Sequence, residues 1–401
     1  MLVILVVLVV FVLYNPKEPP IKVAPFYYLN SLEEVMSITK IFNAEKSDYE
    51  TQGLFLGQDN GLADTINRKY PEIRKLYKTM KKMDWDENEF DYSPCNVDFK
   101  TCNPSIYNMM IKTLTWQWEA DSVASRSILP IMAPFISSTE LFECWAEITK
   151  NECVHADTYS EIVRSSFDNP AEVLKEVLEI KESLSRLYTV AKVMTFVYDI
   201  SHKVALGVVS KDSDQAYEAA ILATIALLCL ERIQFMSSFA VTFAICDTGL
   251  FNSIGKAVQK IAQDELEIHV ALDKEVIRIE SKTERYQRIY LNIKDVIQKM
   301  VDEVVQGELE WVTYLFSGGD ELVGVSEELL KQWCLFNAKD VYKFLKLESP
   351  YELPKQNPLK FMEKWLDISK TQPSPQEEDN GQYKLNSVRK DDADTTFDVD
   401  F

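Results

Sequence analysis

Apolar residues recur at helical spacing through most of the chain, from about Ile111 to Leu345, with few residues that break helices. Residues three and four positions apart share one face of an α-helix, so this pattern predicts long helices that pack on one another. We expect helices over residues 107–128, 138–167, 171–207, 213–246, 251–286, 288–316 and 325–345. Connections are predicted at Asn169–Pro170, Ser210–Ser213 and Ser317–Asp320. The sequence has no alternation of strand and helix patterns and only 11 glycines, which favours an all-α fold.

Both ends of the chain differ from this middle. Residues 2–13 are almost purely apolar, but a membrane-spanning helix needs about 20 residues. The run also lacks the preceding basic residue and the following small-residue cleavage site of a signal peptide. We therefore expect residues 1–35 to lie outside the folded unit, with translation starting at Met36; a membrane anchor is the less favoured alternative. Residues 370–401 are polar and acidic, which predicts a disordered tail.

The charge and cysteine content exclude several functional classes. Lys and Arg total 43 against 63 Asp and Glu, a formal net charge of −20, which disfavours binding to nucleic acid. Seven cysteines occur without a CxxC pair, which argues against a disulfide scaffold or a structural zinc site and indicates a reducing compartment. We expect a cytoplasmic protein with no membrane or nucleic-acid partner. The chain has only three histidines, so any imidazole-based metal chemistry depends on very few positions.

Two of the histidines lie close to carboxylates within predicted helices. Glu152, His155 and Tyr159 have the spacing i, i+3 and i+7, which brings them to one helix face. Glu265 and His269, at i and i+4, share a face as well. Such pairs also occur on many solvated helices, so either cluster alone is weak evidence. A buried pair of this kind, however, needs a compensating charge, which a metal ion provides.

Two further carboxylates interrupt strongly apolar segments, where an unpaired charge is unfavourable. Asp121 follows the stretch TLTWQWEA, and Glu231 lies within AAILATIALLCLERIQFMSSFAVTFA. Four predicted helices therefore offer four carboxylates and two imidazoles: Asp121, Glu152, His155, Glu231, Glu265 and His269. This set matches a di-iron or di-manganese carboxylate site inside a four-helix bundle. Oxygen ligands with two imidazoles suit iron or manganese better than copper or structural zinc.

At these motifs the sequence resembles the small, radical-generating subunit of class I ribonucleotide reductase, over roughly Gly53 to the C-terminus. The matching stretches are GLFLGQDNGL, KKMDWDENEF, EADSVASRSI, WAEITKNECVHADTYSEIVRS, CLERIQFMSSFAVTFA and IAQDELEIH. The resemblance implies a ferritin-like helical bundle with a buried di-metal site, extra flanking helices and a disordered C-terminal tail. It divides the chain into an extra segment, an arm with the first helix, the bundle, and a linker with the docking tail, at residues 1–35, 36–106, 107–350 and 351–401.

The resemblance also implies roles for individual residues. The six residues above would bind two iron ions per chain, or two manganese ions, which react with O₂ to form a stable radical on Tyr159. Phe235, Phe239 and Ile261 would form an apolar pocket that shields this radical. The resemblance further implies radical transfer through His155 and through three other residues, namely Asp264, Trp85 and Tyr383.

One departure from the family pattern concerns the second ligand pair. The family has Glu-x-x-His, whereas residue 266 is leucine and His269 stands one residue further on. A regular helix still brings Glu265 and His269 within about 40° of each other around the helix axis. Alternatively, a π-bulge absorbs one inserted residue, which could bring Glu267 closer to the metals. We favour Glu265 as the ligand because it directly follows Asp264, which is placed like the relay aspartate of the family.

The resemblance implies a large catalytic subunit as partner and a homodimer of this chain. The last residues, DDADTTFDVDF, alternate acids with two phenylalanines and would dock on the large subunit. That subunit, rather than this chain, would bind the nucleotide, so ribonucleoside-diphosphate reductase activity would need both.

Two other functional classes remain as alternatives. A ferritin-like di-metal oxygenase or oxidase without radical transfer would share the six ligands but has no use for Trp85, Tyr383 or a docking tail. A non-enzymatic helical bundle for iron storage or with a structural role would show mineralisation or assembly instead of binding a stoichiometric pair of ions.

Overall fold

The computed structural model describes residues 43, 46–50, 53–58 and 61–367. The predicted N-terminal segment, the tail, Tyr383 and the translation start at Met36 lie outside these residues. Within them, the regular structure consists of helices, with a few isolated β-bridges. The all-α prediction is therefore confirmed for the described part of the chain. The division of the chain into functional segments stays a prediction.

A short 3₁₀ turn and two short helices precede the bundle: η1 (Asp48–Glu50), α2 (Pro71–Met83) and α3 (Cys95–Thr101). The bundle itself begins with α4 (Pro104–Met132), α5 (Thr139–Ser166), α6 (Pro170–Glu179) and α7 (Lys181–Ala205). It continues with α8 (Asp214–Cys229), α9 (Phe235–Cys246), α10 (Asn252–Asp264) and α11 (Val270–Glu280). The last helices are α12 (Glu284–Phe316), α13 (Glu327–Phe344) and α14 (Met362–Trp365).

Two five-residue π-helical segments connect helices that would otherwise be continuous. Segment η2 (Leu230–Gln234) joins α8 to α9, and segment η3 (Glu265–His269) joins α10 to α11. The two π segments contact each other in the middle of the bundle. A π segment accommodates an extra residue and is frequent at functional sites, so their meeting point is a natural place to look for chemistry.

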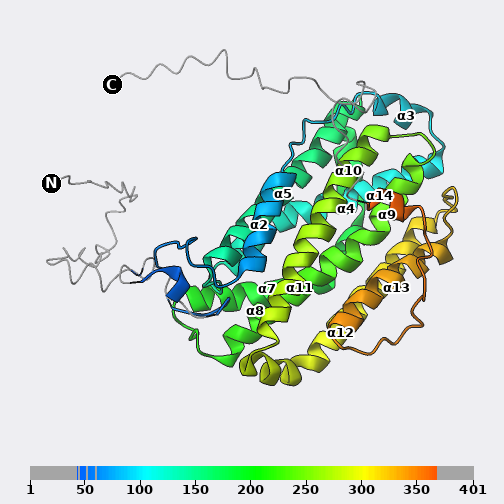
Figure 1. The fold of residues 1–401 in the computed structure, drawn as a ribbon. Helices are drawn as coiled ribbons and strands as arrows, with labels where there is room; N and C mark the ends of the chain where they lie inside the picture. Colours follow the sequence, from blue (N-terminus) through cyan, green and yellow to red (C-terminus); the bar gives the residue numbers. More distant parts are fainter. Residues whose placement is uncertain (1–42, 44–45, 51–52, 59–60, 368–401) are drawn as a thin grey trace, which may run out of the picture.

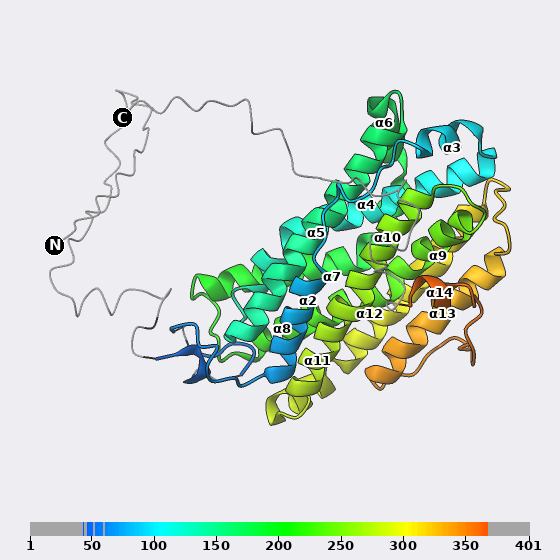
Figure 2. The ribbon, with the colours of Figure 1, turned by 45° about the horizontal axis from the view of Figure 1, so that its top comes forward.

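The long helices run side by side along the bundle (Figure 1). Helix α4 packs on α5, α7 and α9, while α12 packs on α7, α8 and α13. Helices α13 and α14 lie on the opposite side of the bundle from α2 in both views (Figure 2). The bundle is therefore flanked by α2 on one side and by α13 and α14 on the other.

Together α8, η2 and α9 form one continuous helical rod, from Asp214 to Cys246. By composition it is apolar enough to cross a membrane, with a mean hydropathy of 1.7 over its most apolar window. In the structure 94% of that window is buried against other helices, so this rod is a core element. It is the one such helix among the residues that the structure describes, and it does not indicate a membrane protein.

Polar caps mark where five of these helices begin. The first helical turn leaves backbone N–H groups without partners, and a side-chain oxygen at the N-cap accepts from one of them. Such caps begin α4, α5, α8, α12 and α13, through Asn103, Ser138, Ser213, Thr283 and Ser326. Proline, which lacks an N–H, starts α2, α4 and α6.

The predicted helices match the observed ones except at two breaks. The expected helix over 171–207 is two helices, because the chain breaks at Ile180. There Ser183 Oγ lies within hydrogen-bond distance of the Ile180 carbonyl and of a Glu119 carboxyl oxygen, a local alternative to helical hydrogen bonding. The break expected near residue 287 lies at 281–283 instead, where Thr283 caps α12. The three predicted connections lie between helices, at the predicted places.

Candidate metal centre

The six predicted ligands converge in the middle of the bundle. Asp121 extends from α4, Glu152 and His155 from α5, Glu231 from η2, and Glu265 and His269 from η3. All six side chains are at most 2% exposed. Four helices thus bring carboxylates and imidazoles to one point that water does not reach.

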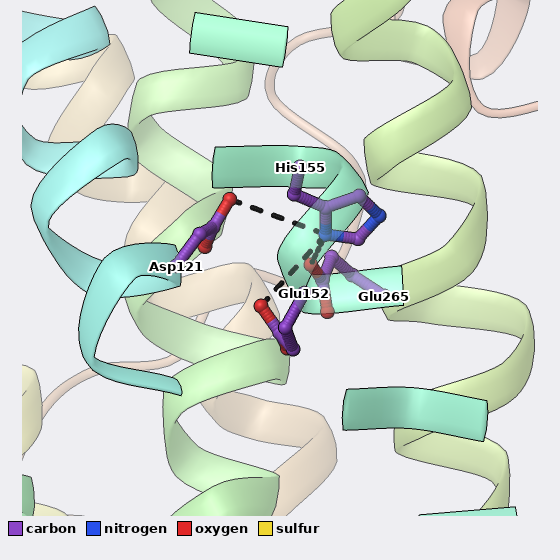
Figure 3. Close-up of side chains that lie close together, drawn as sticks. All are labelled: Asp121, Glu152, His155 and Glu265. Atoms are coloured by element: carbon purple, nitrogen blue, oxygen red, sulfur yellow. Dashed lines mark ion pairs between the residues drawn. The ribbon is translucent and has the colours of Figure 1, made fainter. Parts of the chain in front are cut away.

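The first half of this cluster surrounds His155 (Figure 3). Its Nδ1 atom lies 3.1 Å from Glu265 Oε1, 3.8 Å from Glu152 Oε2 and 4.0 Å from Asp121 Oδ2. These four residues each offer a ligand atom within 4.8 Å of the others. Figure 3 shows the three carboxylates turned toward the ring nitrogen.

The second half consists of Glu152, Glu231, Glu265 and His269, whose ligand atoms also lie within 4.8 Å of one another. His269 Nδ1 lies 2.7 Å from Glu265 Oε2 and 3.6 Å from Glu152 Oε1. Glu152 and Glu265 belong to both halves. The arrangement therefore consists of two adjacent sites that share two carboxylates.

The cluster fits a pair of metal ions because its polar atoms lack other partners. Both oxygens of Asp121, Glu152 and Glu265, one oxygen of Glu231 and three imidazole nitrogens have no hydrogen bond within the described residues. Buried carboxylates without donors are strongly unfavourable, and divalent cations would satisfy them. The donor set of four carboxylates and two imidazoles suits iron or manganese.

The protein alone cannot keep all four carboxylates ionised at this point. Burial, followed by repulsion from Glu265, raises the pKa of Glu152 to about 8. Burial raises the pKa of Asp121 and of Glu231 well above their usual range. Glu265 behaves in the opposite way: although burial disfavours its charge, the neighbouring His269 and His155 lower its pKa. Bound cations would make the ionised form favourable for the whole set.

For the second ligand pair, the structure combines the π geometry of one alternative with the inward Glu265 of the other. Residues 265–269 form the π segment η3, and within it Glu265 is fully buried while Glu267 is exposed. The π geometry thus absorbs the extra residue and turns Glu265 and His269 inward. Glu267 does not take part in the cluster.

Tyr159 lies on the same face of α5 as the cluster residues and is 1% exposed. Its hydroxyl has no hydrogen-bond partner within the described residues. Burial raises the pKa of this phenol well above its usual value, and the charge of Asp121 raises it further. Phe235, Phe239 and Ile261, predicted as its pocket, are at most 1% exposed, and the two phenylalanine rings stack with centroids 5.5 Å apart.

A line of hydrogen bonds leads from the cluster to Trp85. His155 Nε2 lies 3.1 Å from Asp264 Oδ2, on the side of the ring opposite the carboxylates. The Trp85 indole N–H donates to the same oxygen at 2.7 Å. The indole is 7% exposed, so the line ends just below the surface. Of the residues predicted for radical transfer, three are thus joined, and Tyr383 lies outside the described residues.

The sequence reasoning missed one buried ion pair beside the cluster, between Arg186 on α7 and Glu308 on α12. The signal was available, because Glu308 interrupts an apolar helix face that includes Val304, Val305 and Trp311. An interruption of the same kind had marked Glu231. The partner on α7 could not be identified without the packing of the two helices.

Comparison with known proteins places these features in a family. The family model described as ribonucleotide reductase, small chain, matches residues 63–358, well over half of the chain. The chain is 23% identical over 370 residues to a ribonucleoside-diphosphate reductase subunit beta of Buchnera aphidicola (subsp. Baizongia pistaciae), covering 89% of this chain and 97% of that protein. It is 24% identical over 361 residues to ribonucleoside-diphosphate reductase 1 subunit beta of Escherichia coli O157:H7, covering 86% and 95%.

Two solved structures share the fold. The ribonucleotide reductase R2 subunit from Clostridium botulinum superposes with a TM-score of 0.66 at 19% identity, covering 79% of this chain and 95% of that one. The dimanganese(II)-NrdF of Streptococcus sanguinis superposes with a TM-score of 0.60 at 14% identity, covering 76% and 99%.

Proposed function

Because the chain belongs to the ribonucleotide reductase small-chain family, we propose that it is the radical-generating small subunit of a ribonucleoside-diphosphate reductase. It is then one component of an enzyme whose large subunit binds and reduces the ribonucleotide. The observation that carries the proposal is the hydrogen-bonded line from the cluster through Asp264 to Trp85. A metal oxygenase that completes its chemistry within the bundle needs no such line, and this favours radical transfer over the oxygenase alternative.

The six clustered residues would hold the metal pair. Asp121 and His155 belong to the first half of the cluster, Glu231 and His269 to the second half, and Glu152 and Glu265 to both. When bound, two adjacent iron or manganese ions supply the electrons that reduce dioxygen and the oxidising power that removes one electron from Tyr159. We propose two iron ions per chain; manganese would use the same ligands, as the dimanganese neighbour supports.

Tyr159 contributes a protonated phenol in an apolar setting. Since burial raises its pKa, the hydroxyl keeps its proton at neutral pH, and loss of an electron must be accompanied by loss of that proton. After burial, the charge of Asp121 is the largest cause of this raised pKa. The buried Phe235, Phe239 and Ile261 would then exclude water and reductants from the radical.

Asp264 connects the imidazole of His155 to the indole of Trp85. Its Oδ2 accepts from both rings, so it fixes the His155 tautomer with the proton on Nε2 and leaves Nδ1 for a metal. An indole that loses an electron becomes a much stronger acid, and Asp264 is in position to take up its proton. Electron and proton transfer between Trp85 and the cluster would therefore be coupled at this carboxylate.

We further propose that the chain works as a homodimer in the cytoplasm and docks on the large subunit through its C-terminal tail, with Tyr383 continuing the transfer line. The support is the family, together with seven cysteines that are all free. Free thiols throughout a chain are typical of a reducing compartment.

The test is electron paramagnetic resonance of the metal-free protein after anaerobic loading with Fe(II) and exposure to O₂. We expect about two irons per chain and a tyrosyl signal that is absent from Tyr159→Phe, while that variant keeps both irons. Two irons without any radical would instead favour the oxygenase alternative or a manganese enzyme. Absence of stoichiometric metal binding would contradict the site.

A further inference from the structure

A buried arginine contacts the π segment that carries Glu231. Arg186 on α7 is 4% exposed and is paired with the fully buried Glu308 on α12. Its Nη2 donates to Glu308 Oε2 at 2.7 Å, and its Nε donates to the other oxygen. The pair lies in the protein interior and is not among the proposed metal ligands.

The remaining donors of the guanidinium reach the junction of η2 and α9. Nη2 donates to the backbone carbonyl of Gln234, the last residue of η2, and in return the Gln234 side-chain amide donates to the Arg186 carbonyl at 2.8 Å. Nη1 and Nη2 donate to the hydroxyls of Ser238 and Ser237, each at 2.9 Å, and Ser237 donates to Glu308 at 2.9 Å. We name this set, Arg186, Gln234, Ser237, Ser238 and Glu308, the arginine clasp.

Two tryptophan rings lie against the guanidinium of Arg186. Its central carbon lies 3.6 Å from the centroid of the Trp116 ring and 4.9 Å from that of Trp311. Trp116 in turn meets Phe235, the first residue after η2, edge to face at 4.8 Å. Contacts with two aromatic rings therefore add to the hydrogen bonds of the guanidinium.

The arginine clasp supplies a hydrogen-bond donor to a backbone carbonyl of the π segment. In η2 the backbone is wider than in an α-helix, and the Phe235 N–H donates to the Leu230 carbonyl five residues earlier. The segment runs through an apolar core where water cannot satisfy displaced backbone groups. A planar donor with five N–H groups can bind a carbonyl, a carboxylate and two hydroxyls at once, which lysine cannot do.

A buried ion pair contributes little net stability, since apolar residues of similar volume are often as stabilising. The role of the clasp is therefore better explained by the backbone geometry that it holds than by net stability. We propose that Arg186 is a positioning residue that holds η2 in its π conformation and so keeps Glu231 directed into the metal cluster before any metal binds. This inference rests on the proposed function, because it assigns Glu231 to the second half of the metal site.

The test compares Mn(II) binding to the metal-free full-length protein and to the double variant Arg186→Met with Glu308→Leu. The double variant replaces both charges with apolar side chains, so we expect it to fold and to melt near the wild-type temperature. We expect its affinity for one of the two ions to fall about 10- to 100-fold, as when a group that orients a metal ligand is lost. Free Mn(II) and the coupled pair are distinguished by their electron paramagnetic resonance spectra.

Two single variants complete the design. Arg186→Lys keeps the charge but not the fork of donors, and its affinity should lie between those of the wild type and the double variant. Lys112→Met breaks another largely buried ion pair, with Asp320, and should bind both ions with unchanged affinity even if it melts earlier. A double variant that binds two ions like the wild type would overturn the inference and leave the proposed function intact. A wild-type protein that binds no pair of ions would overturn both.

Discussion

The two π segments meet at the same cluster but are held in different ways. Segment η2 is anchored on two sides by residues that are not proposed ligands. On one side the arginine clasp binds Gln234. On the other, Arg232 donates to Asn337 and to Asp340 of α13, and Lys274 pairs with Asp340 as well. Glu231 therefore lies in a segment whose shape does not depend on the cluster.

Among the residues that the structure describes, no side-chain ion pair or hydrogen bond from outside the cluster anchors segment η3 in this way. Its two inward polar residues, Glu265 and His269, are both members of the cluster, and Asp264 just before it belongs to the line to Trp85. Within the described part of the chain, the exposed Glu267 makes no contact that would fix the segment. One half of the site is thus anchored by polar residues outside the cluster, whereas the other half is held by the ligands themselves and by the packing of the buried Ile268. The predictions below test this difference.

The largest effect should come from Glu265, which both halves of the cluster share. We expect Glu265→Gln to reduce bound iron from about two ions per chain to none, because the variant removes a ligand from both ions. Measurement of metal content after loading and desalting checks this. The matched control is Glu267→Gln in the same segment, which should keep both ions; loss of metal in this control would contradict the inward orientation of Glu265.

The next largest effect should come from the line that leaves η3. Trp85→Phe removes the indole N–H that donates to Asp264 and an easily oxidised ring, so turnover with the large subunit should fall by about a hundredfold or more. Metal content and the tyrosyl signal should stay as in the wild type. A variant that retains full turnover would show that Trp85 is not needed for transfer.

Metal binding should change the mobility of the two segments unequally. In the metal-free protein, repulsion between carboxylates acts on Glu265 of η3 and on Glu231 of η2, but the clasp also holds η2. We expect Mn(II) to slow amide hydrogen exchange in residues 265–269 by about tenfold or more, and in residues 230–234 by much less. Mass spectrometry of exchanged peptides measures both. Equal protection of the amides in the two segments would contradict the proposed difference in how they are held.

A smaller, graded effect should appear with pH. Metal ligands must be deprotonated, and in the metal-free protein the pKa of Glu152 is about 8 while those of Asp121 and Glu231 are raised well above their usual range. The apparent affinity for Mn(II) should therefore rise between pH 6 and 8, by up to about tenfold per unit for each proton released.

The raised pKa of Glu152 has the opposite effect on the stability of the metal-free protein, which it lowers as the pH rises. A carboxyl whose pKa is raised by folding favours the folded state at low pH, and this contribution is lost as the pH rises from the usual 4.5 of glutamate toward 8. Calorimetry in buffers of different ionisation enthalpy would count the protons released on metal binding. Substitution Glu231→Gln should lower that number, since burial raises the pKa of Glu231 and so favours its protonated form before metal binds. A pH-independent affinity would contradict these pKa directions.

Much of this architecture could be predicted from the sequence because its signals are local. Capping residues such as Ser138 and Ser213 stand next to the helices they begin. Asp121 and Glu231 are recognisable because each interrupts an apolar segment, and the histidine pairs because helical spacing brings them to one face. These are properties of short stretches of chain, independent of how the stretches pack.

The remaining features depend on packing between distant segments. The extra residue between Glu265 and His269 left two helix geometries open, and only the neighbouring helices decide that Glu265 turns inward. The break at Ile180 depends on Glu119 of another helix, which accepts from Ser183. Likewise, Arg186 pairs with Glu308, which lies on another helix and 122 residues later in the sequence. No local pattern contains that pairing.

The seven free cysteines have a consequence for the durability of a protein that handles oxygen. Burial is the largest cause of a raised pKa at every one of them, so all seven remain thiols near neutral pH. The thiolate is the form that oxidants attack first, on the way to sulfenic acid and disulfides. Even Cys153, which is exposed beside Glu152, shares this shift. The cysteine side chains of this protein are thereby less susceptible to oxidation than thiolates would be.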